Sequence, residues 1–314
     1  MSGRVLVADP WVALDVVEEA LGPAGVEVEG TELLEGDDVV AVIVSINRAF
    51  GRADLARLPS LRAVATCSTG YDHIDLEAAA EAGVWVIHAA DYCADEVAEH
   101  TIADIVSLLR GISPLDAQVR EGEWDVYLTL PRRIAGTTLG VVGCGRIGSR
   151  VCRLASALGM RVLASDPFVA PGAIRATGAE PVERLADLLA TSEVLTVHTW
   201  LDETTRGLIG AGELAALPEG ALLVNCARAG IVDHAALGEA LRSGHLAGAA
   251  LDVLPEEPPP GDATELSWPG TLLSPHAAWY SAGANVEVHR RPAHDLMLVL
   301  TGREPLYPVV RPSG

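Results

Sequence analysis

The chain has 314 residues, of which 49% are hydrophobic, and it carries a formal net charge of −21 with no lysine among its 22 basic residues. This much apolar material exceeds one ordinary core, so it predicts two domains and excludes disordered and fibrous classes. The acidic surface excludes nucleic-acid and membrane partners, because it repels phosphate backbones and anionic lipids. The absence of lysine excludes chemistry through a Schiff base.

The five cysteines form no CxxC pair and are odd in number. This usage is typical of reduced, buried thiols rather than of a disulfide framework, and we expect no metal site. The apolar stretch at the N-terminus is too short for a signal peptide, and no apolar run reaches the length that spans a bilayer. These features predict a cytoplasmic protein.

Short aliphatic segments alternate with helical segments along the chain, which predicts an α/β fold with two Rossmann-like, doubly wound parallel sheets. In the first part, a helix is expected at Trp11–Leu21. Four strands are expected around it, at Arg4–Ala8, Val39–Ser45, Leu61–Thr66 and Val84–His88.

The second part begins with a predicted helix at Ala94–Arg110, followed by a polar, glycine-bearing stretch that contains Trp124. The segment Leu254–Gly270 is rich in proline and acid, which predicts a loop, and Ser281–Thr301 reads as a last helix. Pro292 lies inside it and is expected to kink or break it. The predicted strands of this part are Thr138–Val142, Arg161–Ser165, Val194–His198, Ala221–Asn225, Gly248–Val253 and Leu272–Ser274.

A glycine-rich turn follows the first of these strands. Gly143 permits a tight turn, Gly145 lets the backbone approach a pyrophosphate, and Gly148 lets the next helix pack close to the sheet. The helix that begins near Arg146 offers free N–H groups and the positive end of its dipole to the phosphates. The motif therefore predicts a dinucleotide site.

Asp166 ends the next strand, eighteen residues beyond Gly148. Its carboxylate is expected to accept hydrogen bonds from the adenosine ribose and to repel a 2′-phosphate, which favours NAD over NADP. The alternative is a structural βαβ unit with an incidental acid. The strand before the turn and the amphipathic helix after it favour the dinucleotide.

Three polar residues follow consecutive predicted strands of the second sheet. Arg228 comes after the strand that ends at Asn225, Glu257 lies in the proline-rich loop after the next strand, and His276 follows the short strand that ends at Ser274. The carboxyl ends of parallel strands share one edge of a sheet. We therefore expect these three side chains near one nicotinamide.

The three residue types suit hydride transfer to a keto acid. Arginine can hold a carboxylate with two bonds and polarise a neighbouring carbonyl. Histidine can protonate the carbonyl oxygen, and a buried glutamate beside it would raise its pKa and orient the ring. Each residue alone has another reading, as an ion pair, a loop residue or a solvated acid, but their shared sheet edge favours catalysis.

Four blocks of sequence closely resemble the D-isomer-specific 2-hydroxyacid dehydrogenase family. They are, in order, Ser68–Asp75, Asn225–Asp233, Leu251–Pro258 and Ser274–Trp279. The similarity extends over essentially the whole chain from the second predicted strand onward. The resemblance implies reversible, NAD-dependent hydride transfer between nicotinamide and a small 2-keto or 2-hydroxy acid, with Arg228, Glu257 and His276 as the catalytic triad.

The resemblance also implies a flavodoxin-like substrate domain of residues 1–92 plus 281–314 and an NAD-binding domain of residues 93–280. A cleft is expected between the domains, and a homodimer is expected through the NAD-binding domains. The expected cofactor contacts are Gly143, Gly145, Arg146, Ile147, Gly148, Asp166, His198, Ala227 and Asp252. The expected substrate contacts are Ser68, Thr69, Gly70, Arg48 and Trp279.

Two of these substrate contacts bear on which acid is used. Arg48 ends the second predicted strand and could hold a second anionic group, although a solvated arginine is an equal alternative. The stretches Ala94–His100 and His276–Ser281 resemble the C-terminal-binding-protein corepressors, in which a tryptophan at the position of Trp279 lines the pocket. This implies a substrate with an apolar or thioether side chain, unless Trp279 is a core residue.

Two other functions stay open. One is an NAD(H)-sensing protein similar to those corepressors, with little or no turnover. The other is a phosphonate-type hydroxyacid dehydrogenase, for which Arg48 could hold the second anionic group. The chain also resembles phosphite-oxidising relatives in the triad, but those carry a lysine near Thr69, and its absence argues against that activity. The chain departs from the usual family pattern at Ala229, His73, Trp200 and Pro292. None of these departures falls on the triad.

Overall fold

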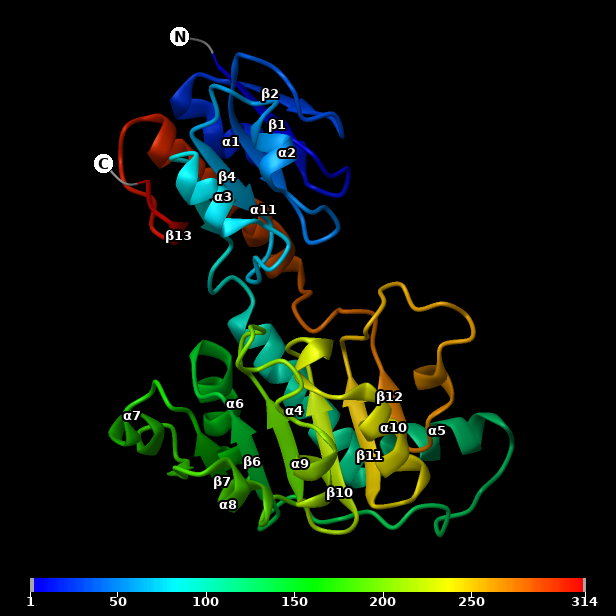
Figure 1. Ribbon diagram of the computed structural model, residues 1–314. Coiled ribbons are helices and arrows are strands. Elements are labelled where there is room, and N and C mark those ends of the chain that lie inside the picture. The colour runs from blue at the N-terminus through cyan, green and yellow to red at the C-terminus, as the bar shows by residue number, and fades with distance from the viewer. Residues whose placement is uncertain (1–2, 313–314) are drawn as a thin grey trace. The chain divides into compact units, whose positions relative to one another are not determined.

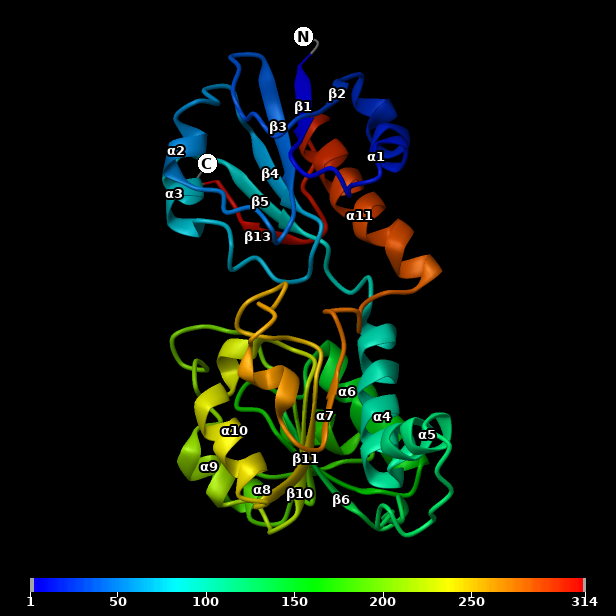
Figure 2. The same cartoon turned by 90° about the vertical axis from the view of Figure 1, so that its right-hand side faces the viewer.

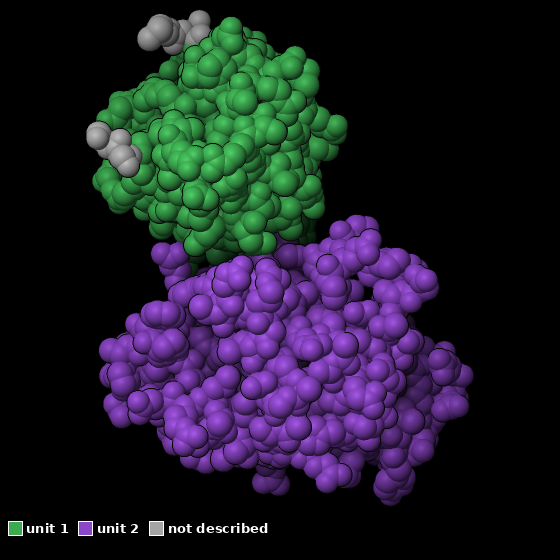
Figure 3. Space-filling model, viewed as in Figure 1, with its two compact units in different colours: residues 1–93, 280–314 green, residues 94–279 purple. Residues whose placement is uncertain are grey.

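The structure, a computed structural model, describes residues 3–312 of the chain. The chain forms two compact units, one of residues 1–93 with 280–314 and one of residues 94–279 (Figure 3). The predicted domain bounds differ from this division by one residue at each junction. Among the described residues, no helix combines the length and the apolar character needed to cross a bilayer.

The sheet of the first unit, unit 1, has six strands in the order β13-β5-β4-β3-β1-β2. Neighbouring strands are parallel except β13, which pairs antiparallel with β5. The sequence analysis missed β2, an edge strand with alternating charges, and β13. The bounds are β1 Arg4–Val7, β2 Glu27–Gly30, β3 Val39–Val44, β4 Ala63–Thr66, β5 Trp85–His88 and β13 Pro308–Val310.

Helices cover both faces of this sheet. Figure 2 shows α1 and α11 on one face and α2 and α3 on the other. The inner strands β1, β3 and β4 are almost wholly buried and aliphatic, as expected where both faces of a parallel sheet are covered, whereas the edge strands β2 and β13 are only partly buried. The helix bounds are α1 Leu14–Leu21, α2 Arg52–Leu55, α3 Leu76–Glu81 and α11 Ala282–Leu300, with a short 3₁₀ turn at Gly22–Ala24.

Pro292 does not break α11, so that expectation was wrong in this respect. The helix continues as one α-helix from Ala282 to Leu300 with Pro292 inside it. Proline removes one backbone hydrogen bond from a helix. Pro292 is buried, with Val288 and Leu296 one turn away on either side, and α11 packs against α1, β3 and β4. Burial of this apolar face compensates for the lost bond.

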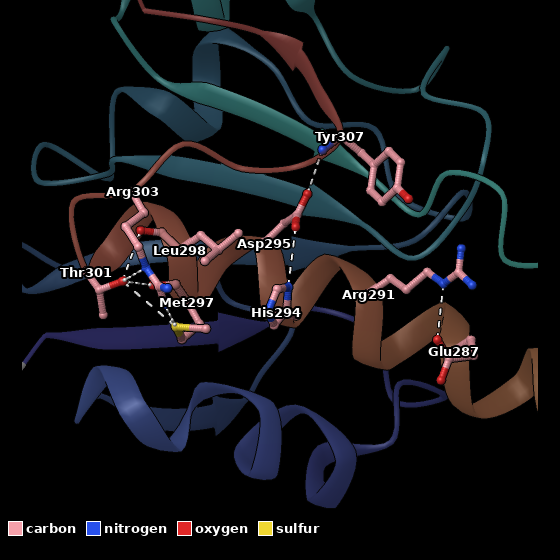
Figure 4. Close-up of polar contacts among 9 residues, drawn as sticks. All are labelled: Glu287, Arg291, His294, Asp295, Met297, Leu298, Thr301, Arg303 and Tyr307. Atoms are coloured by element: carbon pink, nitrogen blue, oxygen red, sulfur yellow. Dashed lines mark hydrogen bonds and ion pairs between the residues drawn. The ribbon is translucent and has the colours of Figure 1, made fainter.

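The C-terminal tail is fastened to α11 by a buried carboxylate (Figure 4). Asp295 is 1% exposed and accepts a hydrogen bond of 2.8 Å from the backbone N–H of Tyr307. Its other oxygen lies 3.6 Å from His294 Nδ1. Because Tyr307 directly precedes β13, this contact aligns the tail with β5. Such a long-range contact leaves no periodic signal, which explains why the sequence missed this strand.

The second unit, unit 2, has a seven-stranded, fully parallel sheet in the order β12-β11-β10-β9-β6-β7-β8. The arrowheads of its strands point to one edge (Figure 1). The chain moves outward from β6 to β8 and then returns to β9 on the other side of β6, which makes a topological switch point. The bounds are β6 Thr138–Val142, β7 Arg161–Ser165, β8 Glu180–Pro181, β9 Val194–Val197, β10 Ala221–Asn225, β11 Leu246–Leu251 and β12 Thr271–Leu273.

Helices α4 and α6 pack together on one face of this sheet, and α9 and α10 pack together on the other (Figure 2). The stretch after α4, expected only as polar and glycine-bearing, contains helix α5. The proline-rich loop is irregular, as predicted, apart from a 3₁₀ turn at Thr264–Ser267. The helix bounds are α4 Ala94–Arg110, α5 Ile112–Arg120, α6 Arg146–Ala157, α7 Pro171–Arg175, α8 Leu185–Leu189, α9 Ala211–Ala215 and α10 His234–Arg242.

Candidate active site

The glycine turn lies at the switch point, between the end of β6 and the start of α6. Gly143 has a φ of 90°, and a Cβ built there would lie 2.7 Å from the carbonyl oxygen of His198. A Cβ on Gly148 would lie 2.0 Å from the carbonyl oxygen of Gly143. Both distances are shorter than any real contact, so strand, turn and helix approach this closely only with glycine at both positions.

The residues around the turn fit a dinucleotide. A Cβ on Gly145 would meet nothing within 4 Å, so the space beside the turn is open. Arg146 and Ile147 form the first turn of α6, whose N-terminus has no side-chain cap. Asp166 follows β7, and its two oxygens accept hydrogen bonds of 2.8 Å from the N–H groups of Cys144 and Phe168. The turn and the acid that would hold the ribose are therefore fixed to each other.

His198 follows β9 and supports the turn from the neighbouring strand. Its N–H donates to the carbonyl of Val142 at 2.7 Å, and its Nε2 lies 3.0 Å from Thr196 Oγ1. Burial lowers the pKa of His198 to about 4. The ring is therefore neutral at pH 7, which suits a role in packing beside the cofactor turn and not a role as a second proton donor.

This histidine predicts acid sensitivity of the fold. The pKa of His198 is about 4 in the folded chain and about 6.5 when exposed. The unfolded chain alone takes up the proton between these values, so the free energy of unfolding should fall as the pH drops from 6.5 to 4. At pH 5 the loss is about 2 kcal/mol. Urea unfolding at pH 7 and pH 5 should show a smaller loss for His198→Gln, and an equal loss in both proteins would contradict the assignment.

The predicted triad follows three adjacent strands of unit 2. Arg228 lies after β10, Glu257 after β11 and His276 after β12. The backbone at Arg228 is held by the buried amide of Asn225, whose Nδ2 donates to the Arg228 carbonyl at 3.0 Å. The Oδ1 of the same amide accepts from the N–H of Ala227 at 3.0 Å. This loop presents the guanidinium at the edge where the other two residues lie.

Glu257 and His276 are joined directly, with Glu257 Oε2 at 2.6 Å from His276 Nδ1. The other carboxylate oxygen accepts from the N–H of Leu254 at 2.9 Å. Burial alone would raise the pKa of Glu257, but the hydrogen bonds from His276 and Leu254 and the positive charges of His276 and Arg228 outweigh it, so this pKa lies below its ordinary value. An ionised carboxylate keeps the proton on Nδ1, which leaves Nε2 for a substrate.

Asp252 fixes the loop that carries His276. It is 2% exposed, and its carboxylate accepts hydrogen bonds from Ser274 Oγ at 2.5 Å, Ala277 N at 2.8 Å and Ala278 N at 2.9 Å. Its own carbonyl accepts from the N–H of His276 at 2.9 Å. The family resemblance implied Asp252 only as a cofactor contact, and that role stays a prediction. The structure adds that it positions the histidine, a role that no sequence pattern indicates.

The backbone of His276 is in the left-handed region, with a φ of 52°. A residue with a Cβ is uncommon in this conformation, and such conformations cluster where surrounding bonds over-determine them at functional sites. Here the bonds to Asp252 hold it. The side chain of His276 keeps 26% of its surface exposed, so a substrate can reach it.

The predicted substrate contacts of unit 1 lie on the loop after β4. Thr69 is exposed, Gly70 is partly buried, and Ser68 is buried beneath them. Arg48 belongs to the same unit, but its guanidinium is engaged there, with Nη1 at 2.5 Å from the carbonyl of Glu32 and Nη2 at 3.5 Å from Asp54. That Arg48 holds a second anionic group of the substrate stays a prediction, and these contacts do not favour it.

Trp279 is the last residue of unit 2 and is partly buried. Ala227 precedes Arg228, and its carbonyl accepts a hydrogen bond of 2.9 Å from the Arg228 Nη1.

The sequence analysis did not single out Ser274 or His88 as site residues. His88 ends β5 next to the strand that carries the Thr69 loop, and this parallel neighbourhood was the one signal that could have indicated it.

Comparison with known proteins agrees with this geometry. Residues 102–278 match the model of the D-isomer specific 2-hydroxyacid dehydrogenase, NAD binding domain. The chain is 39% identical over 256 residues to (S)-sulfolactate dehydrogenase of Chromohalobacter salexigens. This alignment covers 82% of this chain and 83% of the relative. It is 34% identical over 309 residues to D-3-phosphoglycerate dehydrogenase of Archaeoglobus fulgidus, covering 95% of this chain but 58% of that longer relative.

Among solved structures, D-lactate dehydrogenase from Aquifex aeolicus in complex with NAD and lactic acid superimposes with a TM-score of 0.88 at 26% identity. The superposition covers 99% of this chain and 100% of that one. The fold, the glycine turn and the ordered sequence blocks thus agree with one another. The chain belongs to the D-isomer-specific 2-hydroxyacid dehydrogenase family of NAD-dependent oxidoreductases, whose NAD-binding domain it contains.

Proposed function

We propose that the protein reduces a small 2-keto acid with NADH and oxidises the corresponding D-2-hydroxy acid in the reverse direction. The observation that carries the proposal is the 2.6 Å bond between Glu257 and His276, at the sheet edge that also carries Arg228. A carboxylate, an imidazole and a guanidinium together supply the charge and the proton that reduction of a carbonyl needs.

The nicotinamide, when bound, supplies the hydride. Arg228 is placed to hold the carbonyl oxygen and the carboxylate with its planar fork, which stabilises the negative charge that develops on the oxygen. His276 gives that oxygen a proton from Nε2, and in the reverse direction it removes the proton from the hydroxyl. Glu257 accepts from Nδ1 and stabilises the imidazolium form of His276 before the proton is given away.

The substrate class is bounded by what the relatives share. Sulfolactate, phosphoglycerate and lactate dehydrogenases act, by name, on acids that differ in the group beyond the hydroxyl-bearing carbon. The carboxylate is common to them, and the groups assigned here to catalysis recognise only the shared part. We infer that the substrate is a 2-keto acid, and the assay below is designed to identify its side chain.

The test is steady-state oxidation of NADH by the purified protein across a panel of 2-keto acids. The panel should include pyruvate, sulfopyruvate and phosphonopyruvate with branched, aromatic and thioether members. Turnover of one member that is lost in His276→Asn supports the proposal and identifies the side chain. Absence of turnover with all members, with NADH still bound, would contradict it and favour an NAD(H)-sensing protein.

We also propose a homodimer, formed through unit 2. After α5 the chain runs through a segment, residues 121–130, whose apolar side chains are turned to solvent: Trp124, Tyr127 and Leu130 are 90%, 88% and 94% exposed. Large apolar side chains that are exposed along one segment are a feature of protein interfaces. A second copy of the chain is the occupant we propose, because this surface belongs to the unit that holds the cofactor turn.

Sedimentation velocity at micromolar concentration is expected to show a dimer for the native chain. Trp124→Glu with Leu130→Glu should shift it to the monomer, because two charges would be buried without partners. Leu306→Glu, another exposed apolar position, lies in unit 1 and serves as control. A native chain that sediments as a monomer would contradict the proposal.

The cytoplasm is the compartment that we propose, since all five cysteines are free thiols.

A further inference from the structure

The loop from Ser68 to Tyr71, here called the amide loop, contains three consecutive backbone N–H groups that are not used within the described part of the fold. It follows β4 near the middle of the unit 1 sheet. Within residues 3–312, the N–H groups of Thr69, Gly70 and Tyr71 donate no hydrogen bond. Consecutive backbone donors of this kind form concavities that bind anions. Under the proposed function, on which this inference rests, the anion is the substrate carboxylate.

Each peptide unit of the amide loop is held by its carbonyl oxygen. Ser68 O accepts from the N–H of Ala89 at 3.0 Å, Thr69 O lies 2.7 Å from His88 Nδ1, and Gly70 O accepts from Ser68 Oγ at 2.5 Å. A trans peptide is planar, and its C=O and N–H point in opposite directions. A bond that fixes a carbonyl therefore also aims the N–H of the following residue.

We propose that His88 is a positioning residue for substrate binding, because its bond to Thr69 O aims the N–H of Gly70 at the substrate carboxylate. Of the three carbonyl bonds, this is the one made by a side chain from outside the loop. His88 ends β5, which lies beside β4 (Figure 2). A carbonyl oxygen only accepts, so Nδ1 of His88 carries the proton, and the bond also polarises the Gly70 peptide.

Besides its hydrogen bond to Thr69, His88 makes a contact through its ring. Substitutions can therefore separate the proposed role of the hydrogen-bond donor from a purely structural role of the ring. Tyr71 lies edge-on to it, with ring centroids 5.4 Å apart and planes at 83°. Phenylalanine at position 88 keeps an aromatic ring for Tyr71 but removes the donor. Asparagine removes the ring but places an amide N–H where Nδ1 stands. A structural role would follow the ring, whereas the proposed role follows the donor.

The amide loop is also held at its base by a second set of contacts, among Thr66, Ser68 and His73. Thr66 Oγ1 lies 2.7 Å from Ser68 Oγ and 3.0 Å from His73 Nε2. Ser68 and Thr66 are buried, so these contacts fix the base of the loop. Loss of the His88 donor should therefore release one peptide plane and leave the loop in place.

The experiment compares the native chain, His88→Phe and His88→Asn by three readouts: KM and kcat for the accepted 2-keto acid, the Kd of NADH, and the Kd of oxamate measured calorimetrically with NADH present. His88→Phe should raise KM and the oxamate Kd by about tenfold or more, the effect of weakening one hydrogen bond to a charged group. Its kcat and NADH Kd should stay within about threefold, and His88→Asn should regain most of the affinity. His245→Phe, which removes a 3.0 Å bond to the carbonyl of Leu214 in unit 2, is the matched control.

Unchanged KM and oxamate affinity in His88→Phe would overturn the inference, as would equal losses in both variants. Oxamate cannot be reduced, so its binding separates this inference from the proposed function. A native chain that binds oxamate but reduces no 2-keto acid would contradict the proposed function, and the His88 variants would still decide the role of the donor. A native chain that does neither would overturn both.

Discussion

Replacing His276 with asparagine should lower kcat for reduction of the accepted 2-keto acid by about a hundredfold to ten-thousandfold, the range that a positioned proton donor contributes. The loss arises because, of the groups that bond to Glu257 within residues 3–312, His276 is the one that can protonate the oxygen as the hydride arrives. Asparagine is chosen over alanine because it tolerates the left-handed backbone found at this position. The bonds from Asp252 to the loop should then persist, and the Kd of NADH should change by less than about threefold.

The measurement is kcat at saturating substrate together with NADH binding by fluorescence. Glu257→Gln is the companion variant: the pKa of Glu257 lies below its ordinary value, so its charge is present throughout the neutral range and only substitution removes it. This variant should lose less activity than His276→Asn. If His276→Asn kept more than a tenth of native kcat, proton donation would have to be assigned elsewhere.

Replacing Arg228 with alanine should lower kcat/KM by at least about a hundredfold, the scale on which removing one charge-stabilising donor acts. Lysine should restore little of this loss, because a point charge cannot hold a carbonyl and a carboxylate with two parallel bonds. The positive charge of Arg228 also helps to keep Glu257 ionised. Part of the loss should therefore appear in kcat and not only in KM.

Steady-state kinetics of Arg228→Ala and Arg228→Lys, with Arg242→Ala as control, would test this assignment. Arg242 lies on α10 with its side chain 52% exposed and pairs only with Glu239 in the same helix among the contacts described. Its loss should be nearly silent, as is usual for a surface pair. Near-native turnover of Arg228→Ala would remove the arginine from the mechanism.

The parallel strands and the glycine turn could be predicted from the sequence, because each leaves a local sequence pattern. Buried parallel strands read as continuous aliphatic runs, and Gly143 and Gly148 stand where any side chain would collide. What it missed lacked such a signal. β2 alternates charged residues at a sheet edge, and β13 depends on Asp295, a partner distant in the sequence. The expected break at Pro292 rested on the low helix propensity of proline, which tertiary packing overrides.

At the site, strand order was enough to gather Arg228, Glu257 and His276, because neighbouring parallel strands deliver their loops to one edge. The supporting contacts could not be read in the same way. Asp252 and His88 act through single hydrogen bonds whose partners are set by loop conformation. Whether Arg48 is free for a substrate depended likewise on its bond to the Glu32 carbonyl.

The division of unit 1 into two chain segments has a consequence for synthesis. Residues 1–93 emerge from the ribosome before unit 2, but α11, which covers one face of their sheet together with α1, belongs to residues 280–314. Domains generally fold in the order in which they are made. Here the continuous unit 2 can fold first, while the face of the nascent sheet that α11 will cover stays partly exposed. Residues 1–93 are thus made before unit 2 but mature after it, which gives chaperones a long time to act on them.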